Sequence, residues 1–171
     1  LNPSFILQGK YLWTILTSMF MHGSIFHLFA NMLSLMFLGG LVEKLIGYKK
    51  FMAVYFASGL AGSMMFIILG ALLGNTNLPA VGASGAVFGI AGMLAVLTPN
   101  LPVYILFIPI AMPMWFGTIL IMFGLWAVSA SFNLPIGNTA HLGGLLVGLS
   151  YAFYLARKHK HKAAMIRRHF S

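Results

Sequence analysis

Long runs of apolar residues, separated by short breaks rich in Pro, Gly and polar residues, dominate the chain. A helix that crosses a bilayer core about 30 Å thick needs about 20 apolar residues, and fewer where other helices enclose it. The pattern therefore predicts an all-α, polytopic membrane helical bundle with about five transmembrane helices. Their expected ranges are 26–42, 51–73, 84–98, 103–129 and 139–156.

The composition supports the membrane assignment and narrows the chemistry. Of 171 residues, 60% are hydrophobic and 6% are charged, whereas soluble domains carry about 25% charged residues. Glu43 is the only acidic residue, and the chain contains neither Asp nor Cys. These counts exclude an Asp dyad, a Ser-His-Asp triad, a thiol nucleophile and a metal cage built from carboxylates or thiolates.

The basic residues gather in two short segments and predict the orientation. Nine of the ten Lys and Arg residues lie in 44–50 and 157–168. By the positive-inside rule, both segments are cytoplasmic. An odd number of predicted helices separates them from residue 26, so the uncharged connections 74–83 and 131–138 are expected to face outward.

We expect a membrane domain over residues 1–156, in which 1–25 form an outer loop, followed by a basic cytoplasmic tail at 157–171. Such a tail can bind nucleic acid, but after a membrane helix it is more typically a topology signal that touches anionic headgroups. We therefore expect membrane lipids, and no nucleic acid, as partners. The pattern predicts no particular oligomeric state.

Four polar side chains in the predicted helices fall at similar depths: His27, Asn31, Ser84 and His141. At ~1.5 Å per helical residue they lie ~18–24 Å from the cytoplasmic ends of their helices. Polar residues inside a membrane bundle are costly unless they are partnered, so they are functional candidates. The four side chains are therefore expected to form one layer below the outer face.

The helix predicted at 84–98 is too short to cross the bilayer from its outer surface. Either the bilayer is thinner there, or the preceding loop dips in and the helix starts below the surface, where non-helical backbone requires surrounding protein or a water-filled cavity. Backbone N–H groups at such a helix start favour negative charge. The segment Gly82-Ala83-Ser84-Gly85 is thus expected to border an aqueous pocket.

Glycines at four-residue spacing predict close contact between the helices at 84–98 and 139–156. They are Gly85 and Gly89 on the first helix, and Gly144 and Gly148 on the second. Small residues at this spacing let two backbones approach closely in a membrane. A crossing there would bring the Ser84 hydroxyl within reach of the His141 imidazole, and a serine beside a base is a nucleophile.

Each candidate also has a structural interpretation. A lone membrane Ser usually bonds back to its own helix, and a lone His is more often a partnered structural group. His22 and His27 are possible metal ligands, but no Cys or Asp accompanies them and Glu43 is remote. We therefore expect no metal and no cofactor.

Three short motifs carry a family resemblance. Residues 22–31 (HGSIFHLFAN) contain His-x4-His-x3-Asn, residues 82–85 contain Gly-x-Ser-Gly, and residues 140–144 contain Ala-His-x-x-Gly. In this order they resemble motifs on the second, fourth and sixth helices of the rhomboid family of intramembrane serine proteases. The resemblance runs from about Trp13 to Ala156. It implies a six-helix core whose first helix is absent from this processed or truncated chain.

The resemblance implies a Ser-His catalytic dyad. Ser84 would attack a peptide carbonyl, and His141 would take its proton. Asn31, His27 and the backbone N–H of Ser84 would line the oxyanion hole. A dyad of this kind needs no acid, which fits a chain without Asp.

The resemblance also implies that the substrates are transmembrane proteins, cut near the outer ends of their membrane segments. Phe123 and Trp126 would lie near the lateral opening through which a substrate reaches the site, as a substrate gate. Two positions depart from the family pattern: Thr14 stands where Arg is frequent, and Phe88 stands where Tyr is common. A phenyl ring can still stack under His141, although it offers no hydroxyl.

We expect an integral protein of a prokaryotic cell (inner) membrane, with the active site opening toward the outer face. Two other function classes fit the same polar layer. A non-catalytic rhomboid-like protein would bind membrane clients, although such relatives usually lose the Ser or the His. A transporter or channel would use His27 and His141 as a proton relay.

Overall fold

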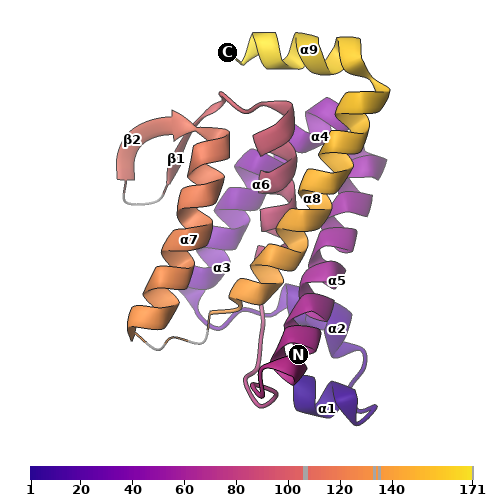
Figure 1. The fold of residues 1–171 in the computed structure, drawn as a ribbon, viewed down its shortest axis with the longest axis vertical. Helices are drawn as coiled ribbons and strands as arrows, with labels where there is room; N and C mark the ends of the chain where they lie inside the picture. Colours follow the sequence, from indigo (N-terminus) through magenta and orange to yellow (C-terminus); the bar gives the residue numbers. More distant parts are fainter. Residues whose placement is uncertain (106–107, 133, 135, 171) are drawn as a thin grey trace.

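The computed structural model describes residues 1–105, 108–132, 134 and 136–170. Its helices form a bundle, with a two-stranded hairpin at one edge (Figure 1). The main elements are α3 (Ile25–Ser34), the π-helical turn η2 (Leu35–Gly39), α4 (Gly40–Ile46), α5 (Tyr48–Leu72), α6 (Ser84–Leu97), β1 (Pro102–Ile105), β2 (Ile108–Pro113), α7 (Met114–Phe132) and α8 (Asn138–Lys158).

Within the described residues, four helical segments are long and apolar enough to cross a membrane. They are Ile25–Ile46, which joins α3, η2 and α4, then Tyr48–Leu72, Met114–Phe132 and Asn138–Lys158. Helix α6 is also apolar but has only 14 residues. An all-α polytopic membrane bundle is therefore confirmed, and α6 is short, as the sequence predicted.

One predicted helix was wrong at its start. The range 103–129 was expected to be helical throughout, but β1 and β2 pair as an antiparallel hairpin and α7 begins only at Met114. Proline has no N–H and disfavours helical conformation in the residue before it, and this stretch contains Pro102, Pro109 and Pro113. The first part of the apolar run 103–129 therefore forms the hairpin instead of a helix.

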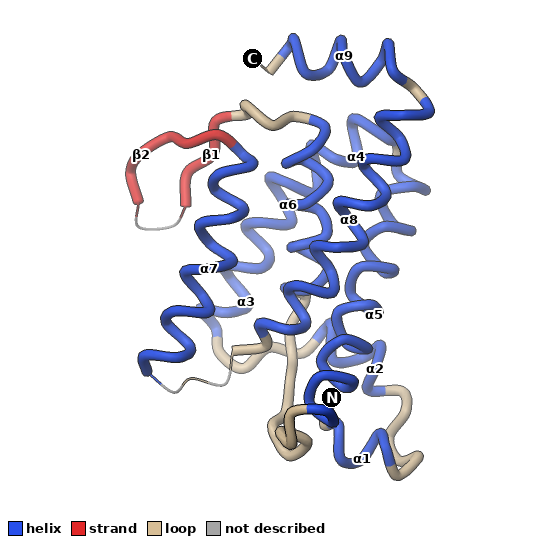
Figure 2. The backbone as a smooth tube through the Cα atoms, viewed as in Figure 1, coloured by secondary structure: helices blue, strands red, loops and turns tan. Residues whose placement is uncertain are grey.

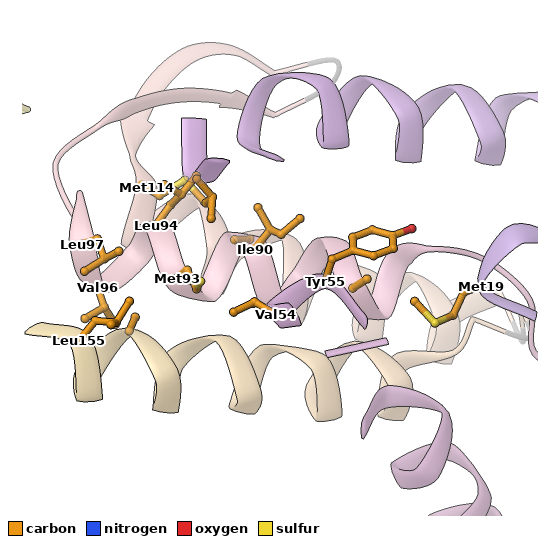
Figure 3. Close-up of a cluster of buried hydrophobic side chains, with 14 residues drawn as sticks. Met19, Val54, Tyr55, Ile90, Met93, Leu94, Val96, Leu97, Met114 and Leu155 are labelled. Atoms are coloured by element: carbon orange, nitrogen blue, oxygen red, sulfur yellow. The ribbon is translucent and has the colours of Figure 1, made fainter. Parts of the chain in front are cut away.

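Helix α6 lies in the middle of the bundle, with α8 and α5 on one side and α3 and α7 on the other (Figure 1). Twelve of its 14 residues are buried, and none of the 14 is charged. Ile90, Met93 and Leu94 are fully buried and belong to the same core cluster as Val54 of α5 and Leu155 of α8 (Figure 3). The helix that begins at Ser84 is thus enclosed by the other helices.

Helices α6 and α8 meet backbone to backbone. A Cβ atom placed on Gly144 would collide with the carbonyl oxygen of Gly85, and one placed on Gly148 would collide with that of Gly89. Only residues without a side chain permit this approach, which is the contact that the glycine spacing predicted. The crossing sets the distance between the first turns of the two helices.

The two ends of the bundle carry different structures (Figure 2). At one end, residues 1–25, expected as a loop, contain short helices: α1 (Pro3–Leu7), α2 (Thr14–Thr17) and the 3-10 turn η1 (Ser18–Phe20). At the other end, α9 (Lys160–His169) lies across the bundle. There the side chain of Arg167 donates hydrogen bonds to the carbonyl oxygen of Val96 at 3.2 and 3.1 Å. The basic tail is therefore a helix docked on the end of α6.

Candidate active site

The loop before α6 places Ser84 at the first position of that helix. Gly82 has a φ of +123°, a conformation that glycine adopts far more readily than other residues. Its N–H donates a hydrogen bond to the carbonyl oxygen of Ser18 at 2.9 Å, which fixes the turn. The N-cap residue Ala83 provides no side-chain cap. The first N–H groups of α6 have no acceptor within the helix and point toward the space before it.

Ser84 and His141 form a hydrogen bond, although 57 positions separate them in sequence. The distance from Ser84 Oγ to His141 Nε2 is 2.8 Å. His141 lies in the first turn of α8 and is only 5% exposed. The glycine contact between α6 and α8 lies directly below this pair. The structure thus brings together the two side chains that the sequence expected to meet.

The imidazole of His141 stacks on the phenyl ring of Phe88. The ring centroids are 4.6 Å apart and the planes differ by 20°. Phe88 lies one turn after Ser84 on α6, so this helix supplies both the hydroxyl and the surface beneath the imidazole. No carboxylate can orient the ring, because Glu43, the only acid, is in α4 near the opposite end of the bundle.

His27 and Asn31 of α3 lie against the loop that leads to Ser84. A Cβ atom placed on Gly82 would be 2.6 Å from Cε1 of His27 and 3.8 Å from Nδ2 of Asn31. Asn31 is 5% exposed, and its amide donates to the carbonyl oxygen of His27 at 3.0 Å. The amide has a second N–H, which this bond does not use. The four polar residues of the predicted layer therefore converge around residues 82–84.

His22, which the sequence analysis paired with His27 as a possible metal ligand, packs against it. The two rings meet edge to face, with centroids 5.1 Å apart. Nε2 of His22 is enclosed and has no hydrogen-bond partner among the described residues. The described part of the chain contains no group of three or more His, Cys, Asp or Glu residues that could hold a metal ion.

Phe123 and Trp126 do not join the polar residues. They lie on α7 at the edge of the bundle, and are 66% and 42% exposed. Among the described residues, no hydrogen bond or ring contact links them to Ser84 or His141. Their exposure fits a membrane-facing position on α7.

Asn138 is a residue near the site that sequence reasoning missed. It opens α8 one turn before His141, and its Oδ1 atom is enclosed with no hydrogen-bond partner among the described residues. Nδ1 of His141 is also enclosed and has no hydrogen-bond partner among the described residues. The sequence signal that could have identified Asn138 is its position, three residues before the candidate base His141.

Comparison with known proteins assigns the family. The family described as "Rhomboid domain" matches residues 9–158 of the chain. The chain belongs to the rhomboid family. This agrees with the helical membrane bundle and with the resemblance carried by the three motifs.

Curated relatives include both active and inactive members of the rhomboid family. The chain is 33% identical over 156 residues to RHOMBOID-like protein 1 of Arabidopsis thaliana, covering 90% of the chain and 37% of the relative. It is 33% identical over 147 residues to the rhomboid protease GluP of Bacillus subtilis, covering 85% and 26%. It is 36% identical over 100 residues to inactive RHOMBOID-like protein 8 of Arabidopsis thaliana, covering 58% and 27%.

The chain spans less than half the length of these curated relatives. The roles of individual residues, the substrate and the orientation are separate questions, and they rest on the geometry of the site.

Proposed function

We propose that the protein is an intramembrane serine endopeptidase that cleaves transmembrane segments of other membrane proteins. The observation that carries the proposal is the 2.8 Å contact between Ser84 Oγ and His141 Nε2. A nucleophile and its base must lie within about 2.6–3.2 Å of each other for direct proton transfer. Stacking on Phe88 presents Nε2 to the hydroxyl without help from a carboxylate.

In the proposed mechanism, Ser84 Oγ attacks the carbonyl carbon of the scissile peptide while His141 Nε2 takes the hydroxyl proton. The tetrahedral intermediate collapses as its C–N bond breaks, and the imidazolium gives its proton to the departing amine. This leaves an ester between Ser84 and the substrate. His141 then deprotonates a water molecule, which hydrolyses the ester and regenerates the Ser84 hydroxyl.

The oxyanion hole is proposed to comprise the backbone N–H of Ser84 and the side chains of Asn31 and His27. Three features support this assignment: the uncapped start of α6, the N–H of Asn31 that its bond to His27 leaves unused, and the position of both side chains against Gly82. Each such donor contributes ~3–4 kcal/mol of transition-state stabilisation in related acyl-transfer sites.

The substrate is proposed to enter sideways past α7, where Phe123 and Trp126 would form the gate. The partial exposure of both rings on an edge helix supports this placement. The basic segments 44–50 and 157–168 support a cytoplasmic location for the end of the bundle that carries α9. The active site then opens toward the outer face, in the proposed setting of a prokaryotic cell membrane.

The test is cleavage of a single-span membrane protein by the full chain in liposomes, combined with labelling by a fluorophosphonate probe. Wild-type protein is expected to cleave the substrate and to carry the probe. Ser84→Ala and His141→Ala are expected to lose both activities while keeping the helical circular dichroism spectrum. Ser150→Ala, a matched substitution at an exposed serine of α8, is expected to behave as wild type. Normal cleavage by Ser84→Ala would overturn the mechanism.

A non-catalytic, client-binding protein is the second candidate, because one relative is named as inactive. It predicts that the wild-type chain binds a membrane protein without cutting it and does not react with the probe. The hydrogen-bonded Ser84 and His141 pair favours the protease. A transporter or channel would instead show flux across the liposome membrane.

A further inference from the structure

The nitrogen of His141 that faces away from Ser84 has no hydrogen-bond partner among the residues that the structure describes. Nδ1 is enclosed by protein and makes no hydrogen bond to any described residue. In neutral imidazole one nitrogen carries the hydrogen, so Nε2 can accept the Ser84 proton only when Nδ1 is the protonated nitrogen. A buried N–H without an acceptor costs ~1–3 kcal/mol. The tautomer needed for catalysis therefore requires an acceptor near Nδ1.

Asn138 provides such an acceptor in the preceding turn of the same helix. Its Oδ1 atom is also enclosed and has no partner among the described residues. Residues three apart are neighbours on a helix surface. Long side chains on a helix also lean back over the preceding turn. A donor and an acceptor, neither of which has a partner in the described part of the chain, thus lie one turn apart at the start of α8.

We propose that Asn138 is a positioning residue: its Oδ1 accepts a hydrogen bond from Nδ1–H of His141, directly or through one water molecule, while Ser84 attacks. The inference rests on the proposed protease function. The amide oxygen would hold the productive tautomer and orient the imidazolium that forms, as a carboxylate does in a catalytic triad. A neutral amide suits a chain whose only acid, Glu43, is remote.

The other neighbours of the imidazole do not fill this role. Phe88 contacts the face of the ring, so it fixes the ring plane but accepts no bond at the ring edge. The nearby titratable groups are the imidazole of His27 on α3 and, beyond it, that of His22. Neither forms a hydrogen bond to Nδ1 in the structure. Asn138 is the acceptor on the same helix as His141 and moves with it.

The test compares Asn138→Leu, which removes the acceptor at similar volume, with Asn138→Asp, which retains a side-chain oxygen. kcat and KM are measured with the full chain in liposomes across about pH 5–8, where imidazoles titrate. We expect Asn138→Leu to lower kcat roughly 5- to 100-fold, as loss of one buried hydrogen bond implies, while KM changes less than about twofold. Asn138→Asp is expected to restore kcat and to move the acidic limb of the rate profile to higher pH, because a carboxylate stabilises imidazolium.

Asn77→Leu, at an exposed asparagine in the loop before α6, is the control and is expected to match wild type. Unfolding temperature is measured for every variant. An unchanged kcat in Asn138→Leu overturns the inference. So does a loss of kcat that Asn138→Asp fails to restore, or one that tracks a lower unfolding temperature. Failure of the proposed function has another signature, because Ser84→Ala would then still cleave, or wild type would react with neither substrate nor probe.

Discussion

The imidazole of His141 is held by Phe88 on one face and by Ser84 at one edge. A stacked aromatic pair contributes ~0.5–1.5 kcal/mol beyond the area that it buries. Phe88→Ala is therefore expected to lower kcat roughly 2- to 10-fold, because the ring can tilt away from Ser84 Oγ. Cleavage assays on a single-span substrate in liposomes measure the effect.

Phe88→Tyr is the matched control for this prediction, because it keeps the aromatic ring and adds a hydroxyl. It is expected to retain most of the wild-type kcat. If Phe88→Ala cleaves at the wild-type rate, the stacking does not orient the imidazole. A lower unfolding temperature without a change in kcat would assign Phe88 to packing alone.

At the residue scale, the polar layer could be predicted because the rise of a helix is fixed. Counting residues from the cytoplasmic ends placed His27, Ser84 and His141 at similar depths, and the structure brings the latter two into contact. Asn138 escaped notice because it is the last residue of the predicted connection 131–138, where polar residues are ordinary. Its significance depends on the enclosure of one atom, which a sequence does not show.

The contact between α6 and α8 depends on glycines at the crossing point. Gly148→Ala would place a methyl group against the carbonyl oxygen of Gly89, and the two helices would have to separate. Overpacking of this kind costs ~1–3 kcal/mol, so the unfolding temperature is expected to fall. Cleavage is also expected to fall, because the distance from Ser84 to His141 depends on the same crossing. Thermal melts followed by circular dichroism measure the stability.

Gly124→Ala, in α7, is the control for this prediction, because the added methyl group would meet no described atom within 4 Å apart from its chain neighbours and the backbone of its own helix. Alanine has the higher helix propensity by about 1 kcal/mol, so this variant is expected to be at least as stable as wild type. Equal unfolding temperatures for Gly148→Ala and Gly124→Ala would show that the crossing tolerates separation.

At the element scale, the hairpin was the feature that the hydrophobic pattern could not reveal. The stretch 102–113 is apolar at almost every position, and such a run fits a buried helix or a strand equally well. Pro109 and Pro113 were the local evidence against a helix. The helix of α6, by contrast, was predictable because its short apolar run is bounded by Gly82 and Pro99.

At the scale of the whole molecule, the basic residues and the candidate site lie toward opposite ends of the bundle, and this separation underlies the proposed orientation. Helix α9, the last turn of α4 with Lys44 and the first turn of α5 with Lys49 and Lys50 carry basic residues at one end of the bundle, whereas the loop before α6 reaches the other end (Figure 1). Ser84 lies toward the end away from the basic residues. With the proposed orientation and the proposed protease function, a substrate would be cut near the outer end of its membrane segment.

This orientation can be tested directly because the chain contains no cysteine. Asn77→Cys lies in the loop before α6 and Lys162→Cys lies in α9, and both positions are exposed. The variants are tested in spheroplasts, which are bacterial cells without their outer membrane and cell wall. A membrane-impermeant maleimide is expected to label Asn77→Cys at once. Lys162→Cys is expected to react only after the membrane is permeabilised, because positively charged segments stay inside. Wild type provides the blank, and the opposite labelling pattern would place the Ser84 side of the bundle in the cytoplasm.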